Sequence, residues 1–434
     1  MTLDRGGFCP DCNDMSTDLA IAPTGGSPKV APTYGGAPSV AGMPQLDASR
    51  AATLGPITLL QPGRILFGNG CVADFVAHLV QLRLRHVFVV TSSAVLDSCA
   101  GVFARLEAAG IRARIHSAVN TEPTVQMFEE CLAVARRGPL DGVIGLGGGS
   151  AMDVAKLVAA LVNSTQTVPE VFGINQLSGR SVFLACLPTT SGTGSEVSPN
   201  SILLDESCQL KKGIISPHLV PDVACVDPLL TCSVPPAVTA ATGLDALTHC
   251  IEAYANRFSH PAVDVYALQG IKLIALHLLV AVADGSNLEA RANLSLGSLY
   301  GGLCLGPVNT AAVHALAYPL GSEYHIAHGI SNAVLLPHVL RFNLTAAPER
   351  YADIAIALGV QPAATPIATA ERGIQRIVEL MARCPMSQRI SEMGVPVDAL
   401  PRLAKAALTV TRLLKNNPRT LTETDALEIY RAAW

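Results

Sequence analysis

The sequence carries little net charge and has no hydrophobic run long enough to span a membrane. Its 434 residues include 30 Lys and Arg against 34 Asp and Glu, and the two signs are interspersed. This pattern excludes the basic surface that nucleic acids and anionic membranes bind. The apolar stretch 271–283 is interrupted by Lys272 and His277, so it falls short of the roughly 20 residues of a transmembrane helix. We therefore expect a small-molecule partner, with no nucleic acid and no membrane.

The cysteines do not follow the spacing of a disulfide-rich scaffold. Twelve are scattered along the chain, and the N-terminus does not resemble a signal peptide. We expect a reducing, cytoplasmic location. Cys9 and Cys12 have the spacing found in zinc ribbons, but no second Cys or His pair nearby would complete four ligands, so the pair is left without a role.

Three segments differ in composition and periodicity. Residues 1–52 are rich in Gly, Pro, Ser, Thr and Ala and lack periodic apolar positions, which predicts a flexible tail. Residues 53–235 alternate β-branched runs with amphipathic stretches, which predicts an α/β domain with a parallel sheet flanked by helices. Residues 236–434 show helical periods throughout, which predicts an all-α domain. The expected strands are 86–91, 142–146 and 182–187, and the expected helices are 124–137, 151–162, 239–254, 262–283, 288–303, 329–342 and one ending at 434.

A glycine-rich turn between a predicted strand and a predicted helix indicates an anion site. Gly147, Gly148, Gly149 and Ser150 form the turn, and the helix that follows carries Asp153. Glycines let backbone amides approach a pyrophosphate, and the helix N-terminus favours its charge. The spacing matches neither the dinucleotide fingerprint nor a nucleotide-triphosphatase loop, so a tight turn without a ligand remains an alternative. A second polar, glycine-containing segment, residues 188–196, follows the next strand and favours binding.

Four residues of the helical half are candidate metal ligands. Asp245 and His249 are four positions apart in a predicted helix, so both side chains lie on one face. His314 and His328 follow, separated by residues that include 319–324, where we expect a loop. Taken singly, each is more typical of a helix-surface pair or a hydrogen-bonded histidine. Together, three imidazoles and a carboxylate in an apolar region suit a divalent metal such as iron or zinc.

These segments resemble the iron-dependent, or group III, alcohol dehydrogenases over residues 55–434. The similar motifs are GLGGGSAMDVAK at 145–156, PTTSGTGSE at 188–196, ATGLDALTHCIEAY at 241–254, and HALAYPLG at 314–321 leading to His328. The resemblance implies a fold of the dehydroquinate synthase type, with a dinucleotide-binding α/β domain and a helical domain. A cleft between them would hold cofactor, metal and substrate.

The resemblance also implies roles for individual residues. Asp245, His249, His314 and His328 match the metal ligands, for Fe²⁺ or Zn²⁺. The residues that match the cofactor site are Gly147, Gly148, Gly149, Ser150, Asp153, Thr189, Thr190 and Thr193, with Lys211 or Lys212 near the nicotinamide. Asn200 and Leu305 fall where the family lines its substrate pocket.

Three departures from the family pattern bear on chemistry. Tyr318 stands where many members have a second histidine, so we predict that a proton relay beside the metal runs through this phenol or through water. Ala327 replaces a proline before the last ligand, which restores backbone freedom. Ser92 stands near the end of a strand where members that prefer NAD have an aspartate, which removes repulsion against a 2′-phosphate and leaves NAD and NADP both open.

The predicted function is hydride transfer between NAD(P) and a small alcohol or aldehyde, with the metal as Lewis acid. Two alternatives remain: an oxidoreductase like maleylacetate reductase, and a cofactor-binding protein that has lost catalysis. A dehydroquinate synthase is disfavoured, because those enzymes lack the Asp-x-x-x-His helix seen at Asp245 and His249. Family resemblance suggests a homodimer or a higher homo-oligomer.

Overall fold

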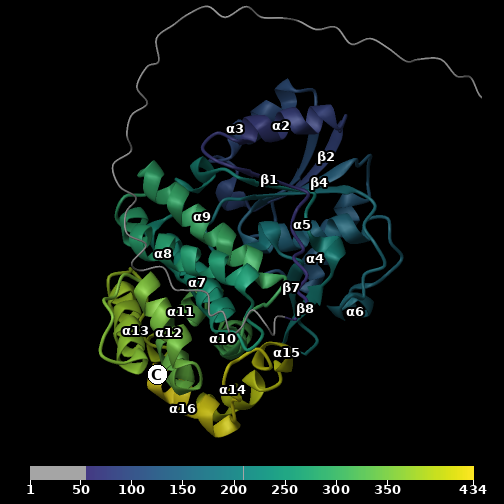
Figure 1. Cartoon of the computed structure of the whole chain (residues 1–434). Helices are drawn as coiled ribbons and strands as arrows, with labels where there is room; N and C mark the ends of the chain where they lie inside the picture. Colours follow the sequence, from purple (N-terminus) through teal and green to yellow (C-terminus); the bar gives the residue numbers. More distant parts are fainter. Residues whose placement is uncertain (1–54, 209) are drawn as a thin grey trace, which may run out of the picture. The chain divides into compact units, whose positions relative to one another are not determined.

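A six-stranded parallel sheet occupies the first half of the chain. The computed structural model describes residues 55–208 and 210–434, and the strand order is β1-β9-β6-β4-β2-β3 (Figure 1). The central strand β4 is buried along its whole length between β2 and β6, as expected for a parallel sheet covered on both faces. The strands are β1 Arg64–Phe67, β2 His86–Val90, β3 Arg112–His116, β4 Gly142–Gly147, β6 Phe183–Pro188 and β9 Val223–Val226.

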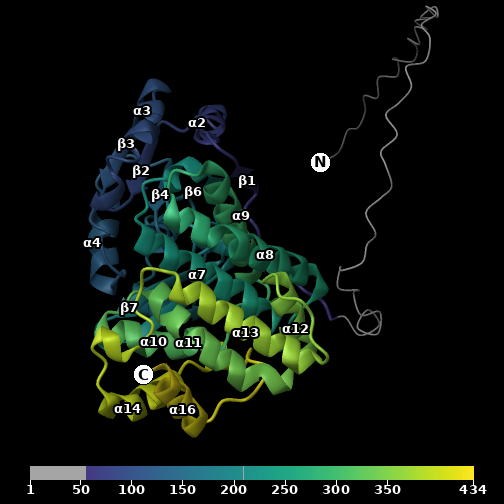
Figure 2. The same ribbon diagram turned by 90° about the vertical axis from the view of Figure 1, so that its left-hand side faces the viewer.

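Helices cover both faces of this sheet because alternate strand residues point to opposite sides. Phe88 and Val90 of β2 pack in one hydrophobic cluster with residues of α4 and α5, whereas Val87 and Val89 pack in another with residues of α2 and α3. Figure 2 shows α2 and α3 away from the helical half of the chain. The helices are α2 Val72–Gln81, α3 Ala100–Ala108, α4 Val125–Ala135, α5 Gly149–Leu161 and α6 Val168–Val171. The predicted α/β architecture is confirmed.

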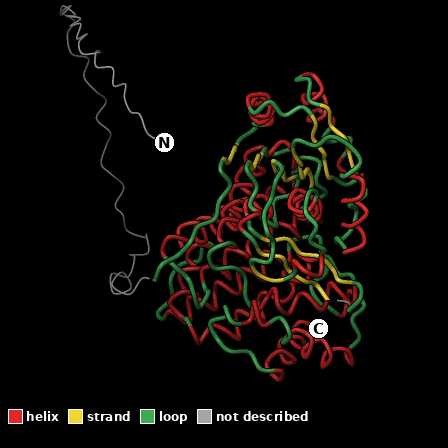
Figure 3. The backbone as a smooth tube through the Cα atoms, turned by 90° about the vertical axis from the view of Figure 1, so that its right-hand side faces the viewer, coloured by secondary structure: helices red, strands yellow, loops and turns green. Residues whose placement is uncertain are grey.

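A smaller sheet, which the sequence analysis did not predict, lies outside the parallel one. It has the order β5-β8-β7, with β7 Asn200–Asp205 antiparallel to β8 Leu210–Ile215 and the short β5 Gly173–Ile174 parallel to β8. Both sheets appear as yellow strands in Figure 3. Residues 200–215 mix polar and apolar side chains without a strict alternation, so no strand period is readable there. The hairpin carries two of the predicted site residues, Asn200 and Lys211.

The second half of the described chain is helical, as predicted. Helix α7 begins after Pro235, with Pro236 at its first position, and from Thr239 onward nearly every residue is buried against its neighbours α8, α9 and α11. One large hydrophobic cluster joins these helices to the C-terminal ones. The helices are α7 Pro236–Tyr254, α8 Pro261–Ala283, α9 Leu288–Leu305, α10 Ala312–Tyr324, α11 His328–Asn343, α12 Pro348–Ala357, α13 Pro366–Ala382, α14 Leu400–Ala407, α15 Thr411–Leu414 and α16 Glu423–Ala433.

One sequence expectation in this half was wrong. Residues 319–324 were expected to form a loop, but α10 continues through Pro319 to Tyr324 and ends at His325 in the left-handed conformation. Proline inside a helix removes one backbone hydrogen bond, but the segment is buried and tertiary packing holds the helix together. The same helix carries His314 and Tyr318, which lie one turn apart on it.

Two further expectations stay predictions. Helix α8 is long and apolar enough to cross a membrane by length and composition, with a mean hydropathy of 1.9, and 44% of that window is buried inside the protein. Buried core helices pass the same test, so the expected lack of a membrane span stays a prediction. The division into domains at residue 235 also stays a prediction. The predicted tail and the Cys9 and Cys12 pair lie outside the described residues.

Candidate metal and cofactor site

The glycine turn sits at the carboxyl end of β4, in the middle of the parallel sheet. Gly147 ends the strand with a φ of +155°, a conformation that other residues rarely adopt, and α5 begins at Gly149. A Cβ atom at Gly149 would lie 2.7 Å from Cγ2 of Thr193, so only glycine lets the two polar loops approach this closely. The backbone amides at the start of α5 therefore face the neighbouring loop, as an anion site requires.

The second polar segment follows β6, the neighbouring strand, and lies against the first. The Thr189 amide donates to the carbonyl oxygen of Gly147 at 2.9 Å, and a Cβ at Gly148 would lie 3.7 Å from Oγ1 of Thr190. The hydroxyl of Thr189 is buried and has no hydrogen-bond partner among the described residues. The two loops thus form one continuous polar surface at the ends of adjacent strands, where open α/β sheets bind ligands.

Asp153 and Lys156 of α5 hold the following loop in place. Oδ1 of Asp153 accepts from the Ser195 hydroxyl at 2.5 Å, and Oδ2 accepts from the Ile202 amide at 2.9 Å. The buried Lys156 Nζ donates to the carbonyl oxygens of Ser198 at 3.0 Å and Asn200 at 2.9 Å. Burial lowers the pKa of Lys156, although Asp153 opposes the shift. Lys156 was not predicted as a site residue, and its position in the same turn-to-helix motif was the only signal.

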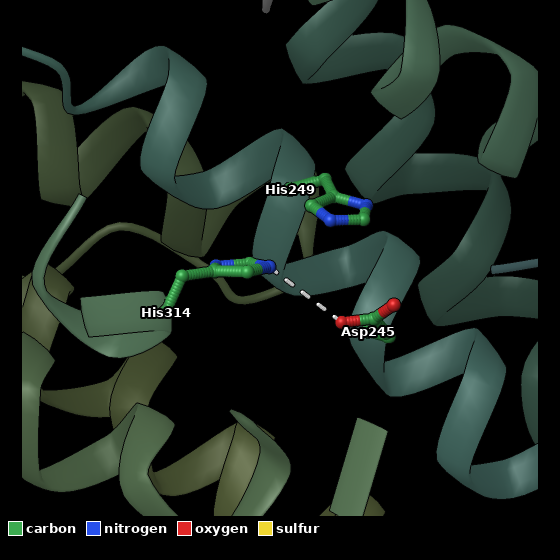
Figure 4. Close-up of side chains that lie close together, drawn as sticks. All are labelled: Asp245, His249 and His314. Atoms are coloured by element: carbon green, nitrogen blue, oxygen red, sulfur yellow. Dashed lines mark ion pairs between the residues drawn. The ribbon is translucent and has the colours of Figure 1, made fainter. Parts of the chain in front are cut away.

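Four candidate metal ligands meet where α7, α10 and α11 come together. Asp245 and His249 project from α7, and Figure 4 shows His314 of α10 facing them. Ligand atoms of these three residues all lie within 4.8 Å of one another, and all three residues are buried. His328, the first residue of α11, places Nε2 3.8 Å from Oδ1 of Asp245, and its side chain is 30% exposed. The structure brings all four predicted ligands together.

The residues present fit a divalent cation. His249, His314 and His328 each have a buried ring nitrogen without a hydrogen-bond partner among the described residues. Leaving buried ring nitrogens unpaired is costly unless they bind a ligand. Burial opposes ionisation of Asp245, but the three histidines hold the pKa of its carboxyl below the usual value. Burial lowers the pKa of His249 and brings that of His328 to about 3, so these two imidazoles stay neutral at neutral pH, the form that binds metals.

A cavity of about 170 Å³ runs from the glycine turn to the histidines. It brings together most of the predicted site residues, namely Gly149, Ser150, Asp153, Thr193, Asn200, Lys211, Leu305, Tyr318 and the four candidate ligands. Gly147, Gly148, Thr189, Thr190 and Ser92 do not line it. Of the two lysines, Lys211 lines the cavity, whereas Lys212 pairs with Asp205 at 2.7 Å. Glu122, Arg412 and Thr310 also line the cavity and were not predicted.

Comparison with known proteins matches this geometry to one family. Residues 62–228 match the family described as iron-containing alcohol dehydrogenase, and residues 239–434 match the C-terminal part of the same family. The chain is 39% identical over 374 residues to long-chain-alcohol dehydrogenase 1 of Geobacillus thermodenitrificans, covering 85% of this chain and 94% of the relative. It belongs to the iron-containing alcohol dehydrogenases.

Other relatives agree with this assignment. A 1,3-propanediol dehydrogenase of Klebsiella pneumoniae is 38% identical over 330 residues, covering 76% of this chain and 85% of that protein. A solved structure of a 1,3-propanediol oxidoreductase superimposes with a TM-score of 0.85 at 34% identity, covering 88% of this chain and all of that one. The protein is therefore an oxidoreductase of alcohols and aldehydes, which confirms the function predicted from the sequence.

In this iron-containing alcohol dehydrogenase, two residues outside the predicted set fix the candidate ligands. Glu252, one turn beyond His249 on α7, accepts from Nδ1 of His314 at 2.6 Å and from the amides of Ala311 and Val313. Asn332 of α11 donates to Oδ1 of Asp245 at 2.6 Å and lies 3.2 Å from Nε2 of His328. Carboxylates and amides behind ligating side chains set their orientation and tautomer. Glu252 lies within the family motif at 241–254, but only the tertiary contact reveals its partner.

Tyr318 lies beside the candidate metal site of the dehydrogenase. Its ring centroid is 6.1 Å from that of His328, and Nζ of Lys211 lies 5.8 Å from the Tyr318 ring. Burial raises the pKa of the Tyr318 phenol, and Arg412 opposes the shift through its charge and a side-chain hydrogen bond. The phenol therefore keeps its proton at neutral pH and can donate it.

Proposed function

We propose that Asp245, His249, His314 and His328 hold Fe²⁺, with Zn²⁺ as the alternative occupant. The observation that carries this is the buried group of Asp245, His249 and His314, whose ligand atoms lie within 4.8 Å of one another in a cavity that the phosphate-type turn also lines. Nε2 of His328 lies 3.8 Å from the same carboxylate. Three nitrogens and one oxygen suit either metal. A bound divalent metal supplies Lewis acidity toward the oxygen of an alcohol or aldehyde.

The chain's own residues would do the rest by binding and orientation. The amides of the Gly147–Ser150 turn would bind a pyrophosphate, and Lys211 would lie near the nicotinamide half of the cofactor. Asn200 and Leu305 line the cavity, where they would contact the substrate. Tyr318 would hold or donate a proton at its phenolic oxygen. These placements favour a small primary alcohol or aldehyde, since residues of α9, α10 and the β7–β8 hairpin line the cavity beside the histidines.

Both nicotinamide cofactors are proposed, NAD(H) and NADP(H). Thr91, Ser92 and Ser93 follow directly after β2, where a carboxylate would repel a 2′-phosphate. The Ser93 hydroxyl donates to Oδ1 of Asn120. Hydroxyl groups at this position do not repel a 2′-phosphate. An assay with each cofactor in parallel tests this, and a preference above about 100-fold for either one would contradict it.

The function is tested by loading the protein with Fe²⁺ or Zn²⁺ without oxygen and assaying propan-1-ol, propane-1,3-diol and the matching aldehydes. We expect about one metal ion per chain and turnover with at least one substrate. His249→Ala should lose both metal and turnover. His277→Ala, which changes a histidine of α8 outside the cavity, is the matched control and should keep both. Turnover by His249→Ala in a chelated preparation would overturn the proposed site. Metal binding without turnover on any substrate would favour the alternative of a cofactor-binding protein that has lost catalysis.

We also propose a cytoplasmic homodimer. All ten cysteines in the described part of the chain are free thiols, which supports a reducing compartment. The dimer rests on family resemblance alone. Light scattering on the purified protein tests it, and a monomer at micromolar concentration would contradict it.

A further inference from the structure

Arg412 lines the cavity without a carboxylate to neutralise it. The residue belongs to the short helix α15, far along the chain from the ligands and from the cofactor loops. In the part of the chain that the structure describes, no Asp or Glu lies within ion-pair distance of its guanidinium. A half-buried guanidinium facing a cavity without an acidic partner is a ready site for an anion.

The surrounding elements fix this guanidinium in position. Helix α15 packs on α10, and α10 packs on β8, so the three lie side by side (Figure 1). A Cβ atom at Gly213 of β8 would lie 3.3 Å from one terminal nitrogen of Arg412, so the absent side chain leaves the space that the guanidinium fills. On its other side Arg412 contacts the hydroxyl of Tyr318. Tyr318 therefore links Arg412 to His328, whose ring centroid lies 6.1 Å from that of Tyr318.

The other charged groups of the cavity already have partners. Lys211 is paired with Glu122 at 2.5 Å. Both carboxylate oxygens of Asp153 accept hydrogen bonds, from Ser195 and Ile202. Asp245 faces the three histidines. Arg412 is left as the one lining cation without a counter-charge among the described residues, so its guanidinium is available to an anion that enters the cavity.

We propose that Arg412 is a specificity-determining residue that binds an anionic group on the substrate, so that the preferred substrates are short aldehydes and alcohols with a carboxylate at the far end. This inference rests on the proposed function. A planar guanidinium donates two parallel hydrogen bonds to a carboxylate, and the aldehyde at the other end of a chain of a few carbons then reaches the histidine cluster. The contact with Tyr318 puts Arg412 on the metal side of the cavity, whereas the phosphate-type turn lies on the α5 side. A substrate carboxylate is thus favoured over a cofactor phosphate.

The experiment compares 4-oxobutanoate with butanal, which share a chain length and differ in charge. In the metal-loaded enzyme we expect a higher kcat/KM for 4-oxobutanoate. Arg412→Gln should lower the ratio of the two kcat/KM values by about 10- to 100-fold, the range for a lost hydrogen bond between charged groups. Arg412→Lys should keep part of the preference for 4-oxobutanoate, because lysine retains the positive charge but lacks the planar guanidinium that donates two parallel hydrogen bonds. Lys415→Gln removes the same charge from the exposed residue that follows α15 and should leave the ratio within twofold.

A binding measurement separates this inference from the proposed function. Calorimetry with 4-hydroxybutanoate and with butan-1-ol, each added to metal-loaded enzyme and NADH, reports affinity without turnover. Selective loss of 4-hydroxybutanoate binding in Arg412→Gln, with an unchanged melting temperature, supports the inference. Equal losses for both alcohols, or a weaker affinity for NADH alone, would overturn it and assign Arg412 to structure or cofactor. If butanal is reduced but 4-oxobutanoate has no advantage in the wild type, only this inference fails. If neither aldehyde is reduced and neither alcohol binds, the proposed function fails as well.

Discussion

Nδ1 of His314 lies 2.6 Å from Oε2 of Glu252, and both side chains are buried. The same carboxylate also accepts from two backbone amides at the start of α10, Ala311 and Val313. Glu252 therefore joins α7, which carries Asp245 and His249, to the helix that carries His314. The contact leaves Nε2 of His314 free to face Asp245 at 3.7 Å.

Glu252→Gln should lower metal affinity by about 10- to 100-fold, because the amide holds the ring less firmly and is a weaker acceptor. Competition with a chromogenic chelator measures the dissociation constant for Zn²⁺ directly, without an activity assay. Glu428→Gln, on the exposed side of α16, is the control and should bind as the wild type does. An unchanged affinity for Zn²⁺ in folded Glu252→Gln would show that Glu252 stabilises the packing of the helices without orienting the His314 ring for the metal.

Gly149→Ala should raise the KM for the nicotinamide cofactor by about tenfold or more. The added Cβ would lie 2.7 Å from Cγ2 of Thr193, so the two loops must separate. Gly101→Ala is the matched control, since nothing lies within 4 Å of its Cβ position. Combining Gly149→Ala with Thr193→Ala should recover part of the affinity. If the KM for the cofactor is as high in the double variant as in Gly149→Ala, the contact with Thr193 is not the cause of the weaker binding.

Tyr318→Phe should lower kcat by about 100-fold with little change in KM, the scale of a lost general acid. Burial raises the pKa of the phenol, so the wild-type residue stays protonated across the neutral range and the phenylalanine variant has no proton to give. Steady-state kinetics with one aldehyde, together with the melting temperature, measures this. A decrease of less than threefold would mean that the proton passes through water.

His338 makes stability depend on pH in the mildly acidic range. Burial on α11 lowers its pKa to about 4, with the charge of Arg341 adding to the shift, against about 6.5 in the unfolded chain. The unfolded state therefore takes up a proton first, so the stabilisation is complete above pH 6.5 and is lost as pH falls toward 4. His338→Gln should flatten the melting temperature between pH 6.5 and 4 relative to the wild type. If the melting temperatures of the two proteins fall equally between pH 6.5 and 4, His338 is not the source of the pH dependence.

The sequence determined the features that depend on local spacing. Asp245 and His249 share a helix face because four residues make about one helical turn, and the glycine turn follows from backbone conformations that only glycine adopts freely. The alternation of strands and helices predicted the parallel sheet, and the helical periods predicted the second half of the described chain. These signals are local, so they are readable without knowing what each segment contacts.

Only the tertiary structure decided which distant segments meet. The β7–β8 hairpin lacks a clear period, yet its packing turns Lys211 into the cavity and Lys212 away from it. A loop was expected at residues 319–324, but burial keeps α10 helical through Pro319 to Tyr324. Arg412 shares no local pattern with the site, and reaches the cavity because α15 packs on α10. Such placements depend on long-range packing free energy, which outweighs local preference wherever a segment is buried.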